Sequence, residues 1–305
     1  MEQSSPFISV IIPTYERANQ LSVCLGALSA QDYPWDWFEV LVVDDGSLTS
    51  PEGSVEAFRH QLNVRLLKQL RSGPAAARNY GAAHAKGSFL AFTDDDCVPA
   101  PGWLRSLATC FVSFPDCAFG GRTINELANN PYSTVSQLIV DYLYAHWNPD
   151  PEHATFFASN NLALPAKCFQ AAGGFDTYFT RAAGEDRELC DRLRSRGYQL
   201  IYVPAALVRH AHPLTFQTFW RQHFNYGCGA YRLHQLRARR DARGSRLEPL
   251  TFYLKMLGYP FTRTRDRKAV LLAVLLTVAQ AANAAGWLAA GLDYLTKLSP
   301  RQDLG

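Results

Sequence analysis

The chain has 305 residues, of which 48% are hydrophobic and 19% charged, with a formal net charge of +3. These values exclude a chain dominated by disorder and suit one large α/β domain with an appended region, or two small domains. The charge is too small to indicate nucleic acid, and we expect no such partner. The seven cysteines form no C-x-x-C pair, which favours reduced thiols in a cytoplasmic compartment over a zinc site or disulfides. The polar start of the chain leads straight into an apolar run, so we expect no signal peptide.

Short apolar runs alternate with helical patterns through the first 120 residues. The predicted strands cover residues 7–12, 38–43, 64–67 and 88–93, and the predicted helices cover 19–30 and 75–86. This alternation predicts an α/β fold with a mostly parallel central sheet and helices on both faces. Polar residues follow three of the strands, at the edge where open α/β sheets bind ligands.

Three consecutive aspartates, Asp94, Asp95 and Asp96, follow the fourth predicted strand. Adjacent carboxylates repel one another, a divalent cation relieves the repulsion, and oxygen ligands suit Mg²⁺ or Mn²⁺. Alternation along an extended chain places Asp94 and Asp96 on the same side. Since Mg²⁺ usually takes one or two carboxylates plus substrate phosphates, the pattern predicts a site for a metal and a diphosphate. The alternative is a solvated acidic turn.

Two other acidic segments have both a structural and a functional interpretation. Asp-Asp-Gly-Ser at 44–47 ends a predicted strand and, taken alone, is read as a turn. Glu185 and Asp186 begin a predicted helix at 185–196, where acidic side chains suit the helix dipole. The functional interpretation of this second pair is a general base that takes the proton of an acceptor hydroxyl.

His210 and His212 follow a predicted strand at 199–203 and precede Pro213. An ordinary partly buried histidine and a metal ligand are both compatible with this pattern.

In combination and order, these segments resemble the motifs of family-2 glycosyltransferases. The similar segments lie at 10–17 (VIIPTYER), 42–47 (VVDDGS), 73–81 (GPAAARNYG), 94–96 (DDD, the D-x-D motif) and 184–189 (GEDREL, the E-D motif). The resemblance covers about residues 7–230. It implies a GT-A fold and an inverting, metal-dependent glycosyltransferase. Such an enzyme moves a sugar from a nucleoside diphosphate sugar, here expected to be a UDP-sugar, to an acceptor hydroxyl.

The resemblance also implies roles for individual residues on the donor side. Thr14 and Asp45 match positions that contact the nucleotide base. Pro13 and Glu16 would line the same pocket, and Arg78 matches the arginine beside the diphosphate. The full set of expected nucleotide-sugar-binding residues is Pro13, Thr14, Glu16, Asp45, Gly73, Arg78, Asp94 and Asp95.

On the catalytic side, Asp186 matches the catalytic base of the family, with Glu185 beside it. Asp96 and Asp94 are the expected ligands of Mn²⁺ or Mg²⁺. Similar enzymes often place a metal-binding histidine near position 210, which favours His210 as a third ligand. His212 remains the rival.

The chain departs from the family pattern at one place. Membrane polysaccharide synthases of this family carry a Q-x-x-R-W motif, and here Gln222 and Tyr226 keep its spacing while Asn225 replaces the arginine. We therefore expect the addition of single sugars.

The resemblance and the composition together suggest how the chain is divided. A GT-A domain is expected at 1–215, with its nucleotide-binding half at about 1–120 and its acceptor half at about 121–215. Residues 216–305 are expected to form a helical, basic and apolar C-terminal region.

The C-terminal region contains a segment at 269–292 that has no charged residue and is long enough to span a bilayer. Gln280 and Asn283 make a lone span less favourable, and the alternative is a buried or amphipathic helix. The basic residues just before this segment, Arg263, Arg265, Arg267 and Lys268, could meet anionic headgroups. We expect association with a membrane surface, on its cytoplasmic face, and leave lying on and spanning the bilayer both open.

Two alternatives from other functional classes remain at this stage. A nucleotidyltransferase would also use a metal on an α/β sheet, but the segment at 13–16 does not resemble its glycine-rich phosphate loop. A catalytically inactive sugar-nucleotide-binding protein of the same fold is the second. The acceptor could be a glycan, a lipid-linked sugar or a small molecule.

Overall fold

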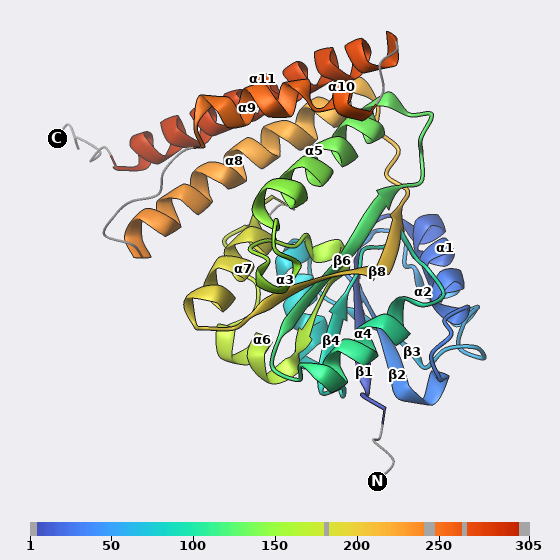
Figure 1. Cartoon of the computed structure of the whole chain (residues 1–305). Coiled ribbons are helices and arrows are strands. Elements are labelled where there is room, and N and C mark those ends of the chain that lie inside the picture. Colours follow the sequence, from blue (N-terminus) through green and yellow to red (C-terminus); the bar gives the residue numbers. More distant parts are fainter. Residues whose placement is uncertain (1–4, 180–182, 241–247, 264–266, 299–305) are drawn as a thin grey trace, which may run out of the picture. The chain divides into compact units, whose positions relative to one another are not determined.

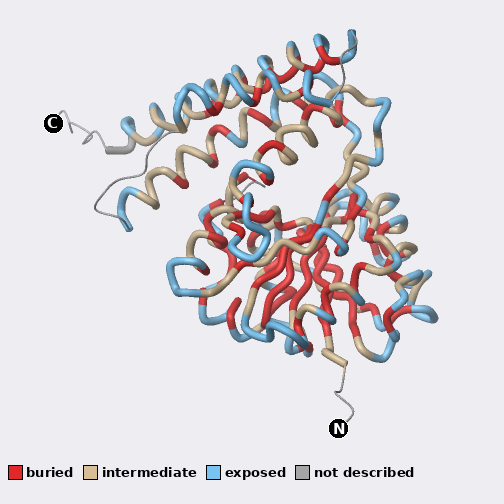
Figure 2. Tube along the Cα trace, viewed as in Figure 1, coloured by how far each residue is buried: buried red, intermediate tan, exposed pale blue. Residues whose placement is uncertain are grey.

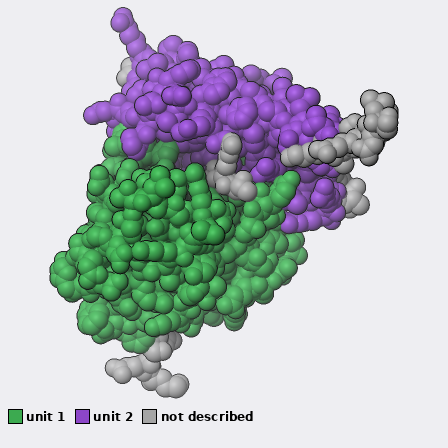
Figure 3. Space-filling model, turned by 180° about the vertical axis from the view of Figure 1, so that it is seen from behind, with its two compact units in different colours: residues 1–127, 143–181, 185–212 green, residues 128–142, 182–184, 213–305 purple. Residues whose placement is uncertain are grey.

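The computed structural model describes residues 5–179, 183–240, 248–263 and 267–298 (Figure 1). The chain falls into two compact units, coloured separately in Figure 3. Unit 1 comprises residues 1–127, 143–181 and 185–212, and unit 2 comprises 128–142, 182–184 and 213–305. Every residue predicted for the site belongs to unit 1. The functional boundary expected at residue 215 stays a prediction.

Unit 1 contains a sheet of eight strands in the order β3-β2-β1-β4-β7-β6-β8-β5. The strands are β1 (Ile8–Thr14), β2 (Phe38–Asp44), β3 (Val64–Lys68), β4 (Phe89–Phe92), β5 (Cys97–Pro99), β6 (Ala118–Asn125), β7 (Leu162–Pro165) and β8 (Leu200–His210). Strands β3, β2, β1 and β4 pair in parallel, as do β6 and β8. Strand β7 is antiparallel to both of its neighbours, and β5 is antiparallel to β8. The predicted mostly parallel sheet is confirmed, with β5 and β7 running against the others.

Helices cover both faces of this sheet, as the alternating pattern predicted. They are α1 (Ala18–Ser29), α2 (Glu52–Glu56), α3 (Pro74–Ala83), α4 (Trp103–Ser113), α6 (Ala166–Ala172) and α7 (Glu185–Ser195). Val10 and Ile12 of β1 share a buried cluster with residues of α1 and α4. The intervening Ile11 faces α3, where a Cβ on Gly81 would lie 2.6 Å from its side chain. The small residues of α3 thus allow a close approach to the sheet, whose strands form the buried core seen in Figure 2.

Unit 2 is helical. It contains α8 (Phe216–Arg240), α9 (Leu250–Gly258), α10 (Pro260–Arg263), α11 (Arg267–Leu298) and residues 131–142 of α5 (Pro131–Trp147). Helices α8 and α11 lie side by side (Figure 1). Two glycines allow this contact, because a Cβ on Gly227 would lie 1.9 Å from the Asn283 carbonyl oxygen, and one on Gly286 would lie 1.9 Å from that of Phe224. A side chain at either glycine would push the helices apart.

Candidate active site

The three aspartates lie just beyond the carboxyl end of β4, beside the end of β1. Asp95 and Asp96 are buried, whereas the Asp94 side chain is 26% exposed. Thr14, the last residue of β1, donates a hydrogen bond from its hydroxyl to Asp95 Oδ2 at 2.7 Å. Because β1 and β4 are parallel neighbours, their ends meet at one edge of the sheet. The sequence predicted a ligand site at this edge of the sheet.

Arg78 connects the aspartates to the acidic pair at the start of α7. Its guanidinium is buried, with Nη2 2.6 Å from Asp94 Oδ1 and Nη1 3.1 Å from Glu185 Oε1. Although burial alone would lower the pKa of Arg78, the two carboxylates raise it, so the arginine is charged. The contact of Arg78 with a donor diphosphate remains a prediction, since its observed partners are carboxylates.

Asp45 holds the loop that leads into α3. Its Oδ1 accepts a hydrogen bond from Ser72 N at 2.8 Å, and its Oδ2 accepts one from Gly73 N at 2.9 Å. Gly73 has φ +92°, which glycine adopts at little cost. The turn at 44–47 therefore stabilises the loop before α3, and recognition of the nucleotide base by Asp45 stays a prediction.

The remaining donor-side residues lie at the end of β1. Pro13 is partly buried and Glu16 is exposed. Glu16 Oε1 accepts a hydrogen bond from Leu48 N, and Glu16 N donates to Ser47 Oγ at 2.9 Å. Glu16 thus joins the turn after β1 to the loop after β2, and its place in a base pocket remains a prediction.

Asp96, His210 and His212 form a cluster at this edge of the sheet. The antiparallel pairing of β5 with β8 places Cys97 opposite His210, and Ala211 N donates to the Asp96 carbonyl at 2.8 Å. His210 Nε2 lies 3.2 Å from Asp96 Oδ1, and His212 Nδ1 lies 3.0 Å from Asp96 Oδ2. The side chains of residues i and i+2 of an extended chain share a face, which explains why both imidazoles reach one carboxylate.

This cluster fits a divalent ion. One possible ligand atom from each of the three residues lies within 4.8 Å of the others. Asp96 Oδ1 is buried and has His210 Nε2 as its neighbour at 3.2 Å, and a carboxylate oxygen with two lone pairs can also bind an ion. Adjacent ligands of an octahedral ion, each about 2.1 Å from it, lie about 3 Å apart, as these side chains do. The carboxylate suits Mn²⁺ or Mg²⁺, and imidazoles suit transition-metal ions, so the mixed set fits Mn²⁺ better than Mg²⁺. Asp94 is paired with Arg78 instead, and its expected part as a ligand stays a prediction.

Asp96 and His210 each stabilise the charged form of the other. Burial alone would raise the pKa of Asp96, but His210 overcomes this and holds that pKa well below its usual range. Burial alone would lower the pKa of His210, but the Asp96 carboxylate raises it. Asp95 differs, because burial raises the pKa of its carboxyl group to about 6 despite the nearby Arg17.

Asp186 lies in the first turn of α7, next to Glu185. Its Oδ1 accepts a hydrogen bond from Arg187 N at 2.7 Å. Burial raises the pKa of Asp186, which makes its carboxylate a stronger base near neutral pH. The neighbouring Arg187 guanidinium stacks 4.1 Å from the centre of the Trp147 ring.

Sequence reasoning missed one contact of this site. Arg17 lies within the motif at 10–17, yet no role was assigned to it. In the structure it contacts both Asp95 and Asp96. The only signal in the sequence was a basic residue shortly after the first predicted strand.

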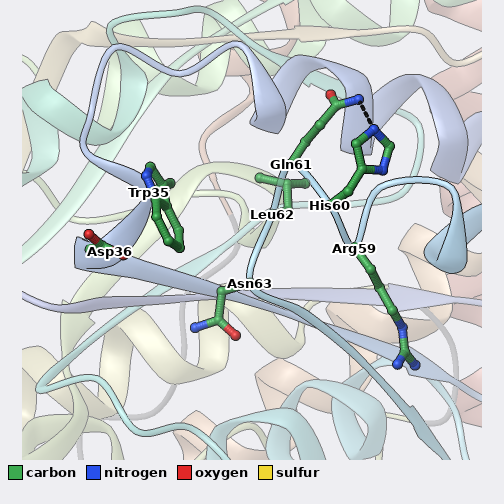
Figure 4. Close-up of a pocket in the computed structure, with 7 residues that line it drawn as sticks. All are labelled: Trp35, Asp36, Arg59, His60, Gln61, Leu62 and Asn63. Atoms are coloured by element: carbon green, nitrogen blue, oxygen red, sulfur yellow. Dashed lines mark hydrogen bonds between the residues drawn. The ribbon is translucent and has the colours of Figure 1, made fainter.

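A surface pocket of about 410 Å³ lies elsewhere in unit 1 (Figure 4). It is lined by Trp35 and Asp36, just before β2, and by residues 59–63, just before β3. Since β2 and β3 are parallel, this pocket is at the amino ends of the strands. It therefore lies at the opposite edge of the sheet from the aspartates.

Comparison with known proteins identifies the family. Residues 9–180 match the family model described as Glycosyl transferase family 2. The chain belongs to glycosyltransferase family 2. The five motifs predicted this family, and membership in it favours glycosyl transfer over nucleotidyl transfer.

Several curated proteins are similar to this chain. Glycosyltransferase AglE of Haloferax volcanii is 41% identical over 244 residues, which cover 77% of this chain and 77% of that protein. Chondroitin synthase of Escherichia coli is 30% identical over 239 residues, which cover 68% of this chain and 35% of that protein. Validoxylamine A glucosyltransferase of Streptomyces hygroscopicus is 31% identical over 220 residues, which cover 63% of this chain and 52% of that protein. The chain thus spans about half or less of the length of the last two relatives.

Two solved structures share the fold. The mannosyltransferase PcManGT from Pyrobaculum calidifontis, solved in complex with GDP-Man and Mn²⁺, has a TM-score of 0.62 and 22% identity, with 98% of this chain and 82% of that chain covered. TarS 1-349 of S. aureus has a TM-score of 0.55 and 18% identity, with 96% and 93% covered. At these identities the likeness concerns the fold, and it confirms the expected GT-A architecture.

Proposed function

We propose that this chain transfers a sugar, with inversion, from a nucleoside diphosphate sugar to an acceptor hydroxyl, and that Asp96, His210 and His212 hold a divalent ion. The observation that carries the proposal is the Asp96 cluster, a buried carboxylate whose two oxygens lie 3.2 Å and 3.0 Å from two imidazoles. It lies at the sheet edge where open α/β folds bind nucleotides. The Mn²⁺ in the PcManGT complex supports the choice of Mn²⁺ or Mg²⁺.

Asp186 is the proposed base. The acceptor oxygen attacks the anomeric carbon while its proton passes to an oxygen of the Asp186 carboxylate. The bond between that carbon and the diphosphate breaks on the opposite face of the sugar. The raised pKa of Asp186 suits a base that works near neutral pH.

The groups around Asp186 hold it in place and neutralise the charge of the leaving group. Glu185 is fixed by its ion pair with buried Arg78, which anchors the first turn of α7. A bound divalent ion would neutralise negative charge on the leaving diphosphate. Asp94 lies next to this system and pairs with Arg78 at 2.6 Å.

A UDP-sugar is the proposed donor. The proposed pocket for the nucleotide base is lined by Pro13, Thr14, Glu16 and Asp45. All four residues lie at or just after the carboxyl ends of β1 and β2. TarS 1-349 has been solved with UDP and with UDP-GlcNAc, whereas the PcManGT complex holds GDP-Man. A donor panel must therefore include both nucleotides. The acceptor is a glycan, a lipid-linked sugar or a small molecule.

We further propose that unit 2 lies on an anionic membrane surface, on its cytoplasmic face. Among the described residues one helix, spanning 267–296, is long and apolar enough to cross a membrane, which by itself is weak evidence. Its outward side forms a row that we call the α11 apolar stripe, composed of Val270, Leu271, Val274, Leu288, Leu292 and Leu295. Arg267 and Lys268, both exposed, begin the same helix.

The packing of α11 favours lying on the membrane over crossing it. The side opposite the stripe is buried, at Leu272, Leu276 and Ala279 among others, and α11 packs against α8. Helix α8 ends with three arginines in its last turn, Arg237, Arg239 and Arg240. A crossing α11 would draw this charged helix toward hydrocarbon, which is costly. An in-plane helix buries only the stripe.

The experiment that tests the enzymatic proposal is a donor-turnover screen. Purified protein is mixed with a panel of UDP- and GDP-sugars and candidate acceptors, with Mn²⁺, with Mg²⁺ or with chelator. Metal-dependent release of nucleoside diphosphate, with product of inverted anomeric configuration, supports the proposal. Consumption of added pyrophosphate, with formation of nucleoside triphosphate and sugar 1-phosphate, would indicate nucleotidyl transfer. Donor binding by calorimetry without any turnover would indicate an inactive binding protein.

A further inference from the structure

Arg17 lies in the turn between β1 and α1, and its side chain reaches the aspartates. Its Nη1 is 3.1 Å from Asp95 Oδ1 and 2.9 Å from Asp96 Oδ2. The Asp95 and Asp96 side chains are 4% and 5% exposed, whereas that of Arg17 is 42% exposed. One guanidinium nitrogen therefore bridges two buried carboxylates, while the rest of the side chain reaches solvent.

The backbone before Arg17 is strained. Glu16 has φ +55° and is the one non-glycine residue with positive φ in the part of the chain that the structure describes. Such a conformation costs free energy and persists only where its surroundings impose it. The hydrogen bonds between Glu16 and residues 47–48 impose it here. The strained turn directs the next side chain, Arg17, toward the aspartates.

Arg17 competes for an atom of the proposed metal site. Asp96 Oδ2 accepts from Arg17 Nη1 and also lies 3.0 Å from His212 Nδ1. A divalent ion bound by Asp96 and the two histidines would have this guanidinium as its neighbour. Two positive charges at that separation repel, and burial of the carboxylates weakens screening by solvent.

We propose that Arg17 is the resident cation of this site, which neutralises Asp95 and Asp96 in the metal-free protein and leaves Asp96 when a divalent ion binds. This inference rests on the metal site proposed above. Arg17 thereby weakens binding of the ion alone. A donor diphosphate adds negative charge beside the ion, so the ion is held tightly only together with the donor. The competing interpretation is that Arg17 merely braces the two carboxylates, in which case its loss would not improve metal binding.

The test is a titration of the full chain with Mn²⁺ in the absence of donor, read by the electron paramagnetic resonance signal of free Mn²⁺. Arg17→Gln removes the charge and keeps hydrogen-bonding groups, and we expect it to raise the affinity about tenfold. Arg17→Lys keeps the charge and should stay within about threefold of wild type. Arg105→Gln is the matched control, because Arg105 forms a surface ion pair with Asp32 and should leave the affinity unchanged. Equal or weaker binding by Arg17→Gln would overturn the inference.

Two further measurements keep the result decisive. If Mn²⁺ binds to wild type and His210→Ala weakens it, the metal site stands and the Arg17→Gln affinity alone decides the inference. If neither wild type nor Arg17→Gln binds Mn²⁺, the metal site itself is wrong and the inference falls with it. If Arg17→Gln does not fold, the test uses the wild-type protein instead and follows the ¹⁵N NMR signal of the Arg17 side chain. This signal is assigned by its loss in Arg17→Lys. It should shift on saturation with Mg²⁺, and an unchanged signal would overturn the inference.

Discussion

Arg78 and Glu185 form a buried ion pair, with Nη1 and Oε1 3.1 Å apart, although they are separated by 107 positions in the chain. The other end of the same guanidinium contacts Asp94 at 2.6 Å. The first turn of α7, which carries Asp186, is thus tied to the aspartates after β4. This tie sets the position of the proposed base relative to the proposed metal site.

Replacing Arg78 by Gln should destabilise the fold. The change removes a buried guanidinium that pairs with both Glu185 and Asp94, and loss of one member of a buried ion pair costs about 3–5 kcal/mol. The free energy of unfolding in urea measures this. Arg105→Gln, which breaks an exposed pair, should cost less than about 1 kcal/mol. Similar losses for the two variants would contradict a stabilising role for the Arg78 bridge.

Replacing Asp186 by Asn should abolish turnover while leaving the donor bound. The amide keeps the shape of the side chain but cannot accept the proton, and general-base catalysis contributes about 10²–10⁴-fold. Steady-state kinetics give kcat, and calorimetry gives the donor Kd. Asp116→Asn, at an exposed carboxylate paired with Lys167, is the control. A kcat within a few-fold of wild type would rule Asp186 out as the base.

Removing either histidine of the cluster should weaken metal binding. Both imidazoles lie within 3.2 Å of Asp96, so we expect His210→Ala and His212→Ala each to lower Mn²⁺ affinity by about tenfold or more. Chelator should abolish turnover of the wild-type enzyme, and added Mn²⁺ should restore it. His153→Ala is the control, because His153 is exposed and pairs with Asp150. If one of the two cluster variants binds Mn²⁺ as wild type does, that histidine is not a ligand.

Charges placed in the α11 apolar stripe should release the protein from membranes. Leu288 and Leu292 are each 65% exposed, so Leu288→Glu with Leu292→Glu should leave the fold intact while losing burial in lipid. Co-sedimentation with vesicles rich in anionic lipid should fall at least about fivefold, from the lost apolar burial alone.

The control for the stripe is Val112→Glu, at an exposed position of α4 in unit 1, which should sediment as wild type does. Light scattering distinguishes a second explanation. If wild type is a dimer that the paired substitutions dissociate, and lipid binding is unaffected, then the stripe is a protein interface and the membrane proposal fails.

Local patterns predicted the nucleotide-binding half of the sheet well. Strands β1, β2 and β4 are buried along most of their length, so each is a largely apolar run followed by polar residues, whereas β3 is partly exposed. The sequence predicted strand β8 only at 199–203. In the structure it continues to His210, since the pairing with β6 shifts between Gly121 and Arg122 and leaves residues 204–206 outside the ladder. That continuation delivers the histidines to Asp96.

The sequence by itself determined the family, the α/β class and most candidate residues. Each motif is a short run of neighbouring residues, and the order of the five motifs can be read along the chain. Only the tertiary structure decided which of those residues meet. The pairing of β5 with β8 brings both His210 and His212 to Asp96, whereas the sequence left them as alternatives for a single metal ligand. Arg78 joins two motifs far apart in the chain, and a strained turn at Glu16 directs Arg17 to two carboxylates. These contacts depend on strand register and chain crossing, and no spacing along the chain encodes either.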